Sequence, residues 1–288
     1  MRRIPLASAA FRRLPPNVRA LALHARGDYA PWEDGFDFTP PALGPGERSG
    51  PPDFVGVGVQ KAGTSWWFEL ISEHPEVFDR PDVLKERHLL SRYCTEPFGP
   101  DQIEQYRGWF PRTEGTIAGE WTPDYFAYPW VPAVLADVAP EARILVLVRD
   151  PIARFLSGLT FRHRMGAPHT STTVADAVRH GFYARHLERV HEFFPPERVL
   201  VLQYERCRDD PAGQLAITYE FLGLAPFTPT ELRREVNVSG GEKEPLAAEA
   251  VGRLVDLYRD DVARLATLVP TLDLSLWPRF ADSAGPPS

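Results

Sequence analysis

The segment DFVGVGVQKAGTS, residues 53–65, decides the fold of this chain. After Asp53 its first half alternates valine and glycine without a charge, which is typical of a strand buried on both faces of a sheet. A loop that contains Gly63 follows, and the next residues, SWWFELISEH, carry apolar side chains at helical spacing. The segment predicts a buried strand, a loop and a helix in succession, which is one unit of an α/β domain.

Two more buried strands are expected further along the chain, and each is followed by a helix. Residues 143–148 and 198–203 are mainly apolar and rich in β-branched side chains, and helices are predicted over residues 151–164 and 212–222. Apolar strands that alternate with helices predict a parallel sheet flanked by helices on both faces. In such sheets ligands bind at the carboxyl ends of the strands.

Two further helices are predicted in the second half of the chain. Thr173 and Asp176 form a capping-box-like start for a helix that continues to Phe194, with Gly181 as the position where it could break. Residues 246–268 predict a long final helix with apolar residues at helical spacing.

Composition and charge exclude several classes of protein. The chain has 288 residues, 43% of them hydrophobic and 25% charged, which is ordinary for a globular protein. A net charge of −7 argues against non-specific nucleic-acid binding, so no nucleic-acid partner is expected. No apolar run is long enough to span a membrane, which predicts a cytoplasmic protein. Cys94 and Cys207 form neither a disulfide framework nor a zinc-binding pattern.

The prolines divide the chain. Residues 1–52 hold nine of the 30 prolines, so we expect a Pro/Arg-rich N-terminal arm of irregular structure there. Residues 53–279 are expected to form one domain, and residues 280–288 a flexible tail.

The loop after the first strand has the outline of a phosphate-binding P-loop, but its lysine is displaced. Gly58 and Gly63 have the required spacing, whereas Thr64 stands where the lysine belongs and Lys61 lies inside the loop. Backbone N–H groups at the helix start would still hold an anion. The residues alone leave a ligand-free turn equally open. Only three of the 32 basic residues are lysines, and each is a mild pointer to a site that needs a compact ammonium: Lys61, Lys85 and Lys243.

The stretch QKAGTSWW resembles the 5′-phosphosulfate loop of sulfotransferases that use 3′-phosphoadenosine 5′-phosphosulfate (PAPS), most of all the heparan sulfate glucosaminyl N- and 3-O-sulfotransferases and their bacterial relatives. The resemblance implies a P-loop NTPase-like sulfotransferase fold. It also implies that Lys61 is catalytic, because the family's loop lysine contacts the 5′-phosphate and the bridging oxygen on which charge builds. The cofactor-binding residues that it implies in the loop are Lys61, Ala62, Gly63, Thr64, Ser65 and Trp66.

The stretch RDPIARFLS, residues 149–157, resembles the family's 3′-phosphate motif. The resemblance implies that Arg149 forks onto the phosphate and that Ser157 donates a hydroxyl hydrogen bond. Two other interpretations stay open: an ordinary junction of strand and helix, or a Walker B strand in which Asp150 binds Mg²⁺.

The stretch KERH, residues 85–88, resembles the family's KE-x-H-F-F motif. The resemblance implies that Glu86 is the general base, that His88 is an auxiliary acid/base or the base itself, and that Lys85 contacts sulfate or substrate. Without the resemblance these residues would be interpreted as a solvated charged turn.

Three further segments complete the predicted site. GEWTPDYF, residues 119–126, resembles the family's E-K-[ST]-P-x-Y-F segment, with Trp121 in place of lysine. It predicts acceptor contacts by Trp121 and Tyr125. Tyr183 and His186 resemble the family's G-x-Y-x-x-H-L helix near the acceptor, but they could equally be core residues. In NVSGGEKEP, residues 237–245, Gly241 and Lys243 are candidates for the 3′-phosphate or ribose.

These observations predict a PAPS-dependent sulfotransferase whose acceptor is a carbohydrate or a small molecule, with PAP as the product and no metal. A Mg²⁺-dependent P-loop kinase or NTPase and a non-catalytic nucleotide or carbohydrate binder are the alternatives. The sequence sets neither the acceptor nor the oligomeric state.

Overall fold

A parallel sheet of four strands forms the centre of the computed structural model, which describes residues 36–80, 82–164, 169–233 and 246–283. The strand order is β2-β1-β3-β4, and every neighbouring pair is parallel. The strands are β1 (Phe54–Gly58), β2 (Gly119–Trp121), β3 (Arg143–Val148) and β4 (Val199–Gln203). The predicted α/β fold class is confirmed, and three of these strands were expected from the sequence.

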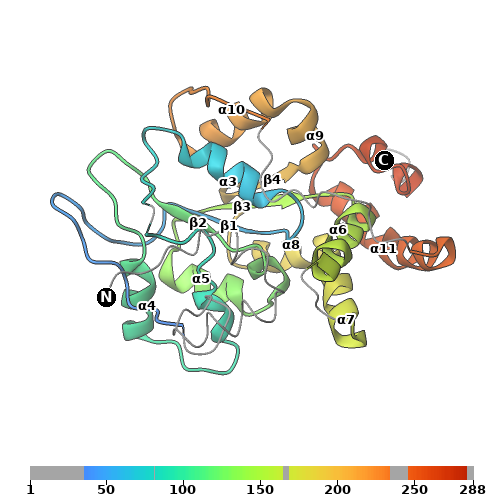
Figure 1. Ribbon diagram of the computed structural model, residues 1–288, viewed down its shortest axis with the longest axis horizontal. Helices are drawn as coiled ribbons and strands as arrows, with labels where there is room; N and C mark the ends of the chain where they lie inside the picture. Colours follow the sequence, from blue (N-terminus) through green and yellow to red (C-terminus); the bar gives the residue numbers. More distant parts are fainter. Residues whose placement is uncertain (1–35, 81, 165–168, 234–245, 284–288) are drawn as a thin grey trace, which may run out of the picture.

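Helices cover both faces of the sheet (Figure 1). On one side lie α3 (Thr64–Ser72) and α10 (Pro211–Leu222), and on the other lie α5 (Val131–Val138) and α8 (Tyr183–His191). The other α-helices are α4 (Pro100–Gly108), α6 (Pro151–Arg164), α7 (Ser171–Arg179), α9 (Tyr204–Asp209) and α11 (Ala248–Leu268). Short 3-10 helices are η1 (Leu89–Arg92), η2 (Tyr125–Ala127), η3 (Pro196–Arg198), η4 (Leu274–Leu276) and η5 (Ala281–Ser283).

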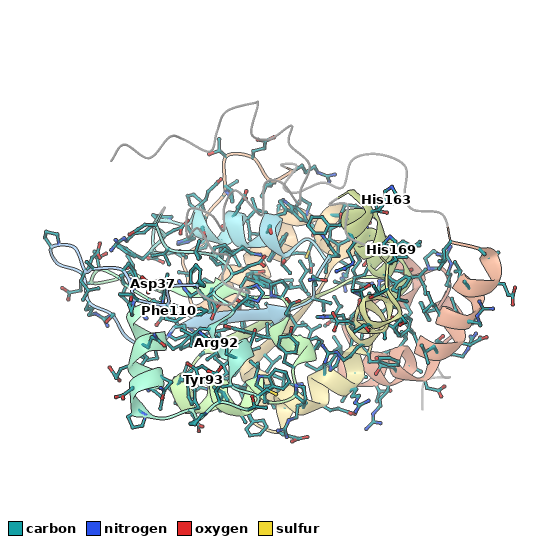
Figure 2. The ribbon with its side chains drawn as sticks, turned by 60° about the horizontal axis from the view of Figure 1, so that its bottom comes forward. Asp37, Arg92, Tyr93, Phe110, His163 and His169 are labelled. Atoms are coloured by element: carbon teal, nitrogen blue, oxygen red, sulfur yellow. The ribbon has the colours of Figure 1, made fainter. Side chains whose placement is uncertain are left out.

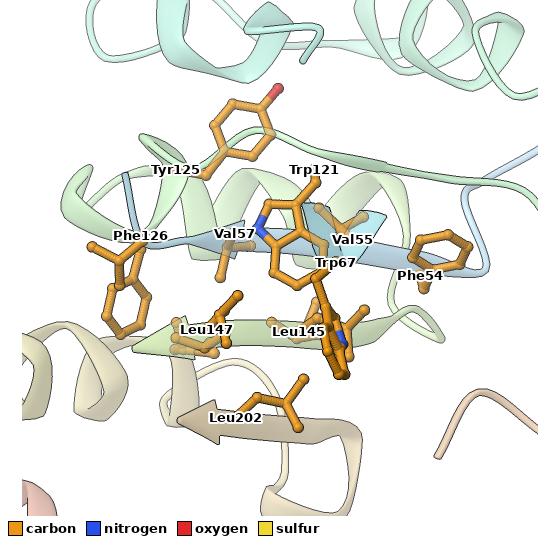
Figure 3. Close-up of a cluster of buried hydrophobic side chains, with 14 of the residues drawn as sticks. Phe54, Val55, Val57, Trp67, Trp121, Tyr125, Phe126, Leu145, Leu147 and Leu202 are labelled. Carbon is orange, nitrogen blue, oxygen red and sulfur yellow. The ribbon is translucent and has the colours of Figure 1, made fainter. Parts of the chain in front are cut away.

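The two glycines of β1 let bulky aromatic rings lie directly on the strand. A Cβ atom added at Gly56 would lie 2.0 Å from Cδ2 of Trp121, and one added at Gly58 would lie 2.7 Å from Cβ of Phe126. Figure 3 shows these rings among the buried side chains of the sheet. The alternation of valine and glycine in β1 is therefore a packing requirement, and it fixes where the segment after β2 lies.

The break expected at Gly181 is confirmed, but the predicted ends of this segment are wrong. It forms two helices, α7 and α8, that end at Arg179 and His191, because the chain turns at Gly181, where an added Cβ would lie 2.6 Å from the ring of Tyr258. The cap of α7 is Thr170 with Thr173, and Asp176 takes no part in it.

Both ends of the described chain pack onto the domain. Trp109 Nε1 donates to the carbonyl oxygen of Phe38 at 3.0 Å, and Figure 2 places Asp37 at the same end of the molecule as Phe110. Phe280 is fully buried. The expected flexible tail therefore does not begin at residue 280, because this side chain is part of the core; residues 284–288 and 1–35 lie outside the described residues.

Among the residues that the structure describes, none of the helices is both long enough and apolar enough to cross a membrane.

Replacing Gly56 with alanine should destabilise the fold by about 1–3 kcal/mol, because the new methyl group overlaps the fused part of the Trp121 indole ring, which is locked in the core. Urea unfolding measures the change. Gly252→Ala is the matched control, since nothing lies within 4 Å of its added Cβ on α11, and it should be neutral or raise stability by about 0.5–1 kcal/mol. Equal stability of Gly56→Ala and the wild type would contradict the packing argument.

Candidate active site

The carboxyl ends of β1, β2 and β3 bring three segments to one edge of the sheet. The loop with Lys61 follows β1, Arg149 follows β3 directly, and Asp124 lies three residues after β2. Because these strands are parallel neighbours, all three segments leave the sheet on the same side. The three segments therefore lie at the carboxyl ends of the strands, where the sequence predicts the site.

The loop after β1 turns sharply into α3. Lys61 has φ of 68° and Gly63 has φ of 92°, so both residues occupy the left-handed region. A Cβ atom added at Gly63 would also lie 2.9 Å from the ring of Tyr204. The turn leaves the first N–H groups of α3, at Thr64 and Ser65, at the helix terminus, where no earlier turn supplies carbonyl partners. This terminus can hold an anion, and Ala62 is buried beneath it.

Lys61 places its ammonium over an aromatic ring of α6. Its Nζ lies 3.1 Å from the ring centroid of Phe161. Burial lowers the pKa of Lys61 to about 8, although the charge of Glu86 acts in the opposite direction. The ammonium is therefore mainly charged at pH 7 and is poorly hydrated, which strengthens its attraction for an anion.

Arg149 is held against the same loop. Its guanidinium donates to the carbonyl oxygen of Lys61 at 3.0 Å and lies over the ring of Tyr204, 4.6 Å from the centroid. The hydroxyl of Tyr183 donates to the carbonyl oxygen of Arg149 at 2.9 Å. Ser157 is half-buried on α6, next to Gly158, where an added Cβ would lie 4.0 Å from Cγ of Lys61. The structure thus brings the two predicted phosphate motifs together.

Lys85 joins the KERH segment to the start of α3. Its Nζ donates to Oγ of Ser65 at 3.2 Å and to Oε1 of Glu86 at 2.7 Å, and it lies 3.5 Å from Oγ1 of Thr64. Burial lowers the pKa of Lys85, while the charge of Glu86 opposes the shift. Lys85 therefore lies at the N-terminus of α3, whereas Lys61 reaches from the loop before α3 to the ring of Phe161 on α6.

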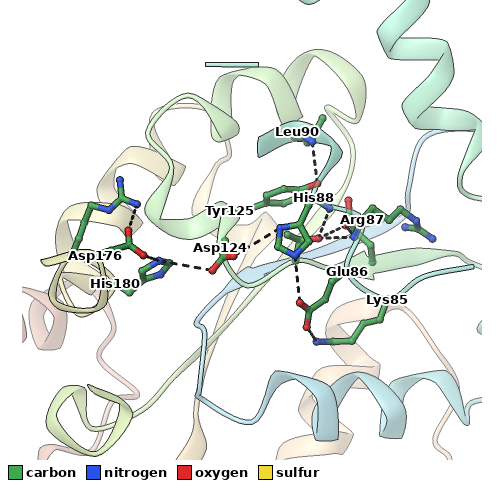
Figure 4. Close-up of polar contacts among 12 residues, drawn as sticks. Lys85, Glu86, Arg87, His88, Leu90, Asp124, Tyr125, Asp176 and His180 are labelled. Atoms are coloured by element: carbon green, nitrogen blue, oxygen red, sulfur yellow. Dashed lines mark hydrogen bonds and ion pairs between the residues drawn. The ribbon is translucent and has the colours of Figure 1, made fainter. Parts of the chain in front are cut away.

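Glu86 lies between Lys85 and His88, as Figure 4 shows. Nε2 of His88 is 3.5 Å from Oε2 of Glu86. Burial raises the pKa of Glu86, but the neighbouring His88 ring and the ammonium of Lys85 outweigh it and hold the pKa at about 2. His88 is 5% exposed, whereas the Glu86 side chain keeps 31% of its surface accessible, so Glu86 is the carboxylate that an acceptor can reach.

A buried carboxylate, Glu120 of β2, fixes the position of the KERH segment. It accepts hydrogen bonds from the hydroxyl of Tyr106 at 2.6 Å, from Oγ1 of Thr122 at 2.6 Å and from the backbone N–H of Arg87 at 3.3 Å. The backbone N–H of Trp121 also donates to the carbonyl oxygen of Lys85 at 3.0 Å. The strand that the sequence did not predict is therefore the support of the predicted base.

Several predicted acceptor contacts are wrong because the side chains lie in the core. Trp121 is fully buried and donates to the carbonyl oxygen of Gly58 at 3.1 Å. Tyr125 is fully buried, and its hydroxyl accepts from the N–H of Leu90 at 3.2 Å. For Tyr183 and His186 the sequence allows either an acceptor contact or a core position, and the structure gives the core position. Tyr183 is fully buried, and Nε2 of His186 lies 2.9 Å from the carbonyl oxygen of Arg179.

The alternative role of Asp150 as a magnesium ligand does not agree with its contacts. Its Oδ1 accepts hydrogen bonds from the N–H groups of Ile152 and Ala153, at 2.8 and 2.9 Å, and so caps α6. Gly241 and Lys243 lie outside the described residues. Within the described ranges, no group of three or more His, Cys, Asp or Glu side chains is arranged to hold a metal ion.

Asp124 is the charged residue of this site that sequence reasoning missed. Its Oδ2 lies 3.9 Å from Nδ1 of His88 and its Oδ1 lies 3.8 Å from Nε2 of His180. Asp124 stands at the unspecified position of the segment that resembles P-x-Y-F, so the motif gave no signal for it.

Comparisons with known proteins identify the family of this chain. Residues 51–239 match the protein family described as the sulfotransferase domain. The chain is 34% identical over 202 residues to heparan sulfate glucosamine 3-O-sulfotransferase 6 of Mus musculus, which covers 64% of this chain and 56% of that protein. It is 33% identical over 190 residues to heparan sulfate glucosamine 3-O-sulfotransferase 3B1 of Homo sapiens, which covers 60% and 46%. The chain spans about half the length of the curated relatives it matches.

A solved structure also resembles this fold. The crystal structure of a sulfotransferase from Alicyclobacillus acidocaldarius has a TM-score of 0.63 and 25% sequence identity, and covers 79% of this chain and 98% of that one. The family match spans more than half of the chain and includes all four strands of the sheet. The chain belongs to the sulfotransferase domain family.

Proposed function

We propose that the protein is a sulfotransferase (EC 2.8.2.-) that transfers the sulfuryl group of PAPS to a hydroxyl or amine of a carbohydrate or small-molecule acceptor. The observation that carries the proposal is that Lys85 lies at the N-terminus of α3 and is bonded to Glu86, while the loop before α3 carries Lys61 and accepts a hydrogen bond from Arg149. Three cations and a helix terminus suit a polyanionic ligand, and a reachable carboxylate suits the deprotonation of an acceptor. We assign this activity to residues 53–279.

The donor set of the site suits PAPS. Bound there, PAPS would supply the sulfuryl group and would leave as PAP. We propose that the 5′ side is held by Lys61 and the loop residues Ala62, Gly63, Thr64, Ser65 and Trp66. Arg149 and Ser157 would hold the 3′-phosphate, and Gly241 and Lys243 remain candidates for the same side.

The chain's own groups supply the proton chemistry of transfer. The acceptor oxygen or nitrogen forms a bond to sulfur while the bond from sulfur to the bridging oxygen breaks, and that oxygen keeps the electron pair. Glu86 takes the acceptor's proton, and the ammonium of Lys61 stabilises the charge on the leaving oxygen. An anion that binds Lys85 competes with Glu86 for its ammonium, so donor binding would raise the pKa of Glu86 and make it a better base.

The relatives suggest which acceptor to test first. Both are heparan sulfate glucosamine 3-O-sulfotransferases, so we propose a hydroxyl of a glucosamine-containing carbohydrate. The tryptophan at position 121 does not bear on this choice, because its ring is fully buried against β1 and meets no acceptor.

Ligand-induced stabilisation separates the proposed activity from a P-loop kinase. PAP (3′,5′-ADP) should raise the melting temperature strongly, because Arg149 and the helix terminus each bind one phosphate group, whereas ADP with Mg²⁺ should have little effect. Differential scanning fluorimetry measures both. Stabilisation by ADP with Mg²⁺ and none by PAP would overturn the sulfotransferase proposal. Transfer of ³⁵S from labelled PAPS to a heparan sulfate oligosaccharide would exclude a purely binding role.

Replacement of Glu86 with glutamine should lower kcat by about 10²–10⁴-fold, because the amide cannot take the acceptor's proton. The affinity for PAP should hold or increase, since a negative charge next to Lys85 is removed. Glu220→Gln, on the exposed side of α10, is the matched control and should keep the wild-type rate. Turnover of Glu86→Gln at the wild-type rate would remove this residue as the base.

The affinity for PAP should fall as the pH rises through about 8, because Lys61 carries its charge below its lowered pKa and loses it above. Titration calorimetry between pH 6.5 and 9.5 measures this dependence. In Lys61→Arg the affinity for PAP should not fall as the pH rises, since arginine stays charged. The variant should turn over more slowly, because the planar guanidinium places its charge differently from an ammonium. Full activity of Lys61→Arg would show that a compact ammonium is not required.

A further inference from the structure

We propose that Asp124 is a positioning residue for proton transfer: it holds the proton of His88 on Nδ1, so that Nε2 can receive the proton that Glu86 takes from the acceptor. The inference deepens the proposed function and rests on it. Asp124 acts through His88 and touches neither donor nor acceptor.

The geometry places the His88 ring between two carboxylates (Figure 4). Nε2 of His88 is 3.5 Å from Oε2 of Glu86, and Nδ1 is 3.9 Å from Oδ2 of Asp124. Both separations exceed a normal hydrogen bond by about 1 Å or less, which is usual for catalytic groups before substrate binds. The two ring nitrogens thus face the two acidic groups separately.

One segment of backbone holds both Asp124 and His88 in place. The hydroxyl of Thr122 accepts from the N–H of Arg87 at 3.0 Å and lies 3.4 Å from the N–H of His88. Tyr125, the residue after Asp124, accepts from the N–H of Leu90 at 3.2 Å. Contacts on both sides of His88 therefore fix its backbone relative to Asp124.

A neutral His88 ring carries one proton, and Asp124 and Glu86 compete for it. With the proton on Nε2 the ring donates to Glu86 and weakens it as a base. With the proton on Nδ1 the ring donates to Asp124, and Nε2 can accept a proton. The competition favours Asp124, because its side chain is the more buried of the two, 17% exposed against 31% for Glu86, so the ring proton replaces more of its lost hydration. Before a donor binds, Lys85 also offsets the charge of Glu86 at 2.7 Å.

In the part of the chain that the structure describes, no lysine or arginine forms an ion pair with Asp124 as Lys85 does with Glu86. Among the described residues Oδ1 of Asp124 has no hydrogen-bond partner, and burial lowers the pKa of His180 to about 3, so that ring is neutral at pH 7. Burial raises the pKa of Asp124 itself to about 6. The titratable and charged groups that face it from the neighbouring elements are Glu86, His88, Tyr128, Asp176, Arg179 and His180.

The proton balance of the step is complete. The acceptor loses its proton to Glu86 as it bonds to sulfur, and Glu86 passes that proton to Nε2 of His88, which becomes an imidazolium. The negative charge of Asp124 stabilises the imidazolium through Nδ1–H until the proton leaves to solvent. Glu86 is then an ionised base again.

The dependence on pH follows from the ionisation of Asp124. Above about pH 6 the Asp124 carboxylate is charged and attracts the proton on Nδ1 of His88. Below about pH 6 the carboxyl group is protonated and this attraction is lost. The kcat/KM of the wild type should therefore fall as the pH falls through about 6. Asp176→Asn removes a negative charge that raises the pKa of Asp124. In this variant the fall of kcat/KM should therefore occur at a lower pH, while the value of kcat/KM well above pH 6 should stay unchanged.

The direct test is ¹⁵N NMR of the His88 ring, with its signals assigned by their loss in His88→Asn. In the wild type above pH 6 we expect the proton on Nδ1, and on titration through pH 6 this preference should disappear. In Asp124→Asn the amide donates to Nδ1, so the proton should move to Nε2, and kcat on a heparan sulfate oligosaccharide should fall about 10-fold or more. PAP should still stabilise the variant.

The outcomes separate this inference from the proposed function. Wild-type kcat and a retained Nδ1–H signal in Asp124→Asn would overturn it, as would a wild-type His88 ring that keeps its proton on Nε2 above pH 6. The wild-type titration needs no variant, so it decides the question even if Asp124→Asn does not fold. A tautomer change without any ³⁵S transfer by the wild type would instead reject the sulfotransferase activity.

Discussion

The buried carboxylate of Glu120 is the interaction on which the site depends. A charge removed from water costs several kcal/mol unless hydrogen bonds replace its hydration, and Tyr106, Thr122 and the backbone of Arg87 provide them. One of these donors belongs to the KERH segment itself. The strand that carries Glu120 therefore sets the position of the proposed base relative to the sheet, and the KERH segment cannot shift without costing a buried carboxylate one of its hydrogen bonds.

The electrostatics of the site are local, because the chain as a whole carries a net charge of −7. The ammonium of Lys61 lies over the ring of Phe161, and the guanidinium of Arg149 lies over the ring of Tyr204. The ammonium of Lys85 forms an ion pair with Glu86. Each cation is partly removed from water before any ligand arrives. An incoming anion therefore meets charges that are already positioned and weakly screened, which is the arrangement that stabilises charge developing on a leaving group.

Local pattern predicted most of the architecture. Strands β1, β3 and β4 are apolar and long enough to be recognised, whereas β2 has three residues and becomes a strand only by pairing with β1. The prediction for Trp121 was wrong. Its place in a motif that resembles an acceptor-binding segment predicted an exposed ring, but the ring packs in the core against Gly56, which has no side chain. Tyr125 failed for the same reason, since a motif does not state which face of a segment meets solvent.

The sequence by itself determined three of the four strands and the helices that follow them, the loop that turns at Gly63, and the residue types that meet at the carboxyl edge of the sheet. Those properties depend on spacing and side-chain chemistry, which are local. Only the tertiary structure decided which side chains face one another: that Glu120 supports Glu86, that Trp121 is core, and that Asp124 faces His88. These relations join positions 33 to 65 apart, and burial and charge act between them only after the sheet has formed.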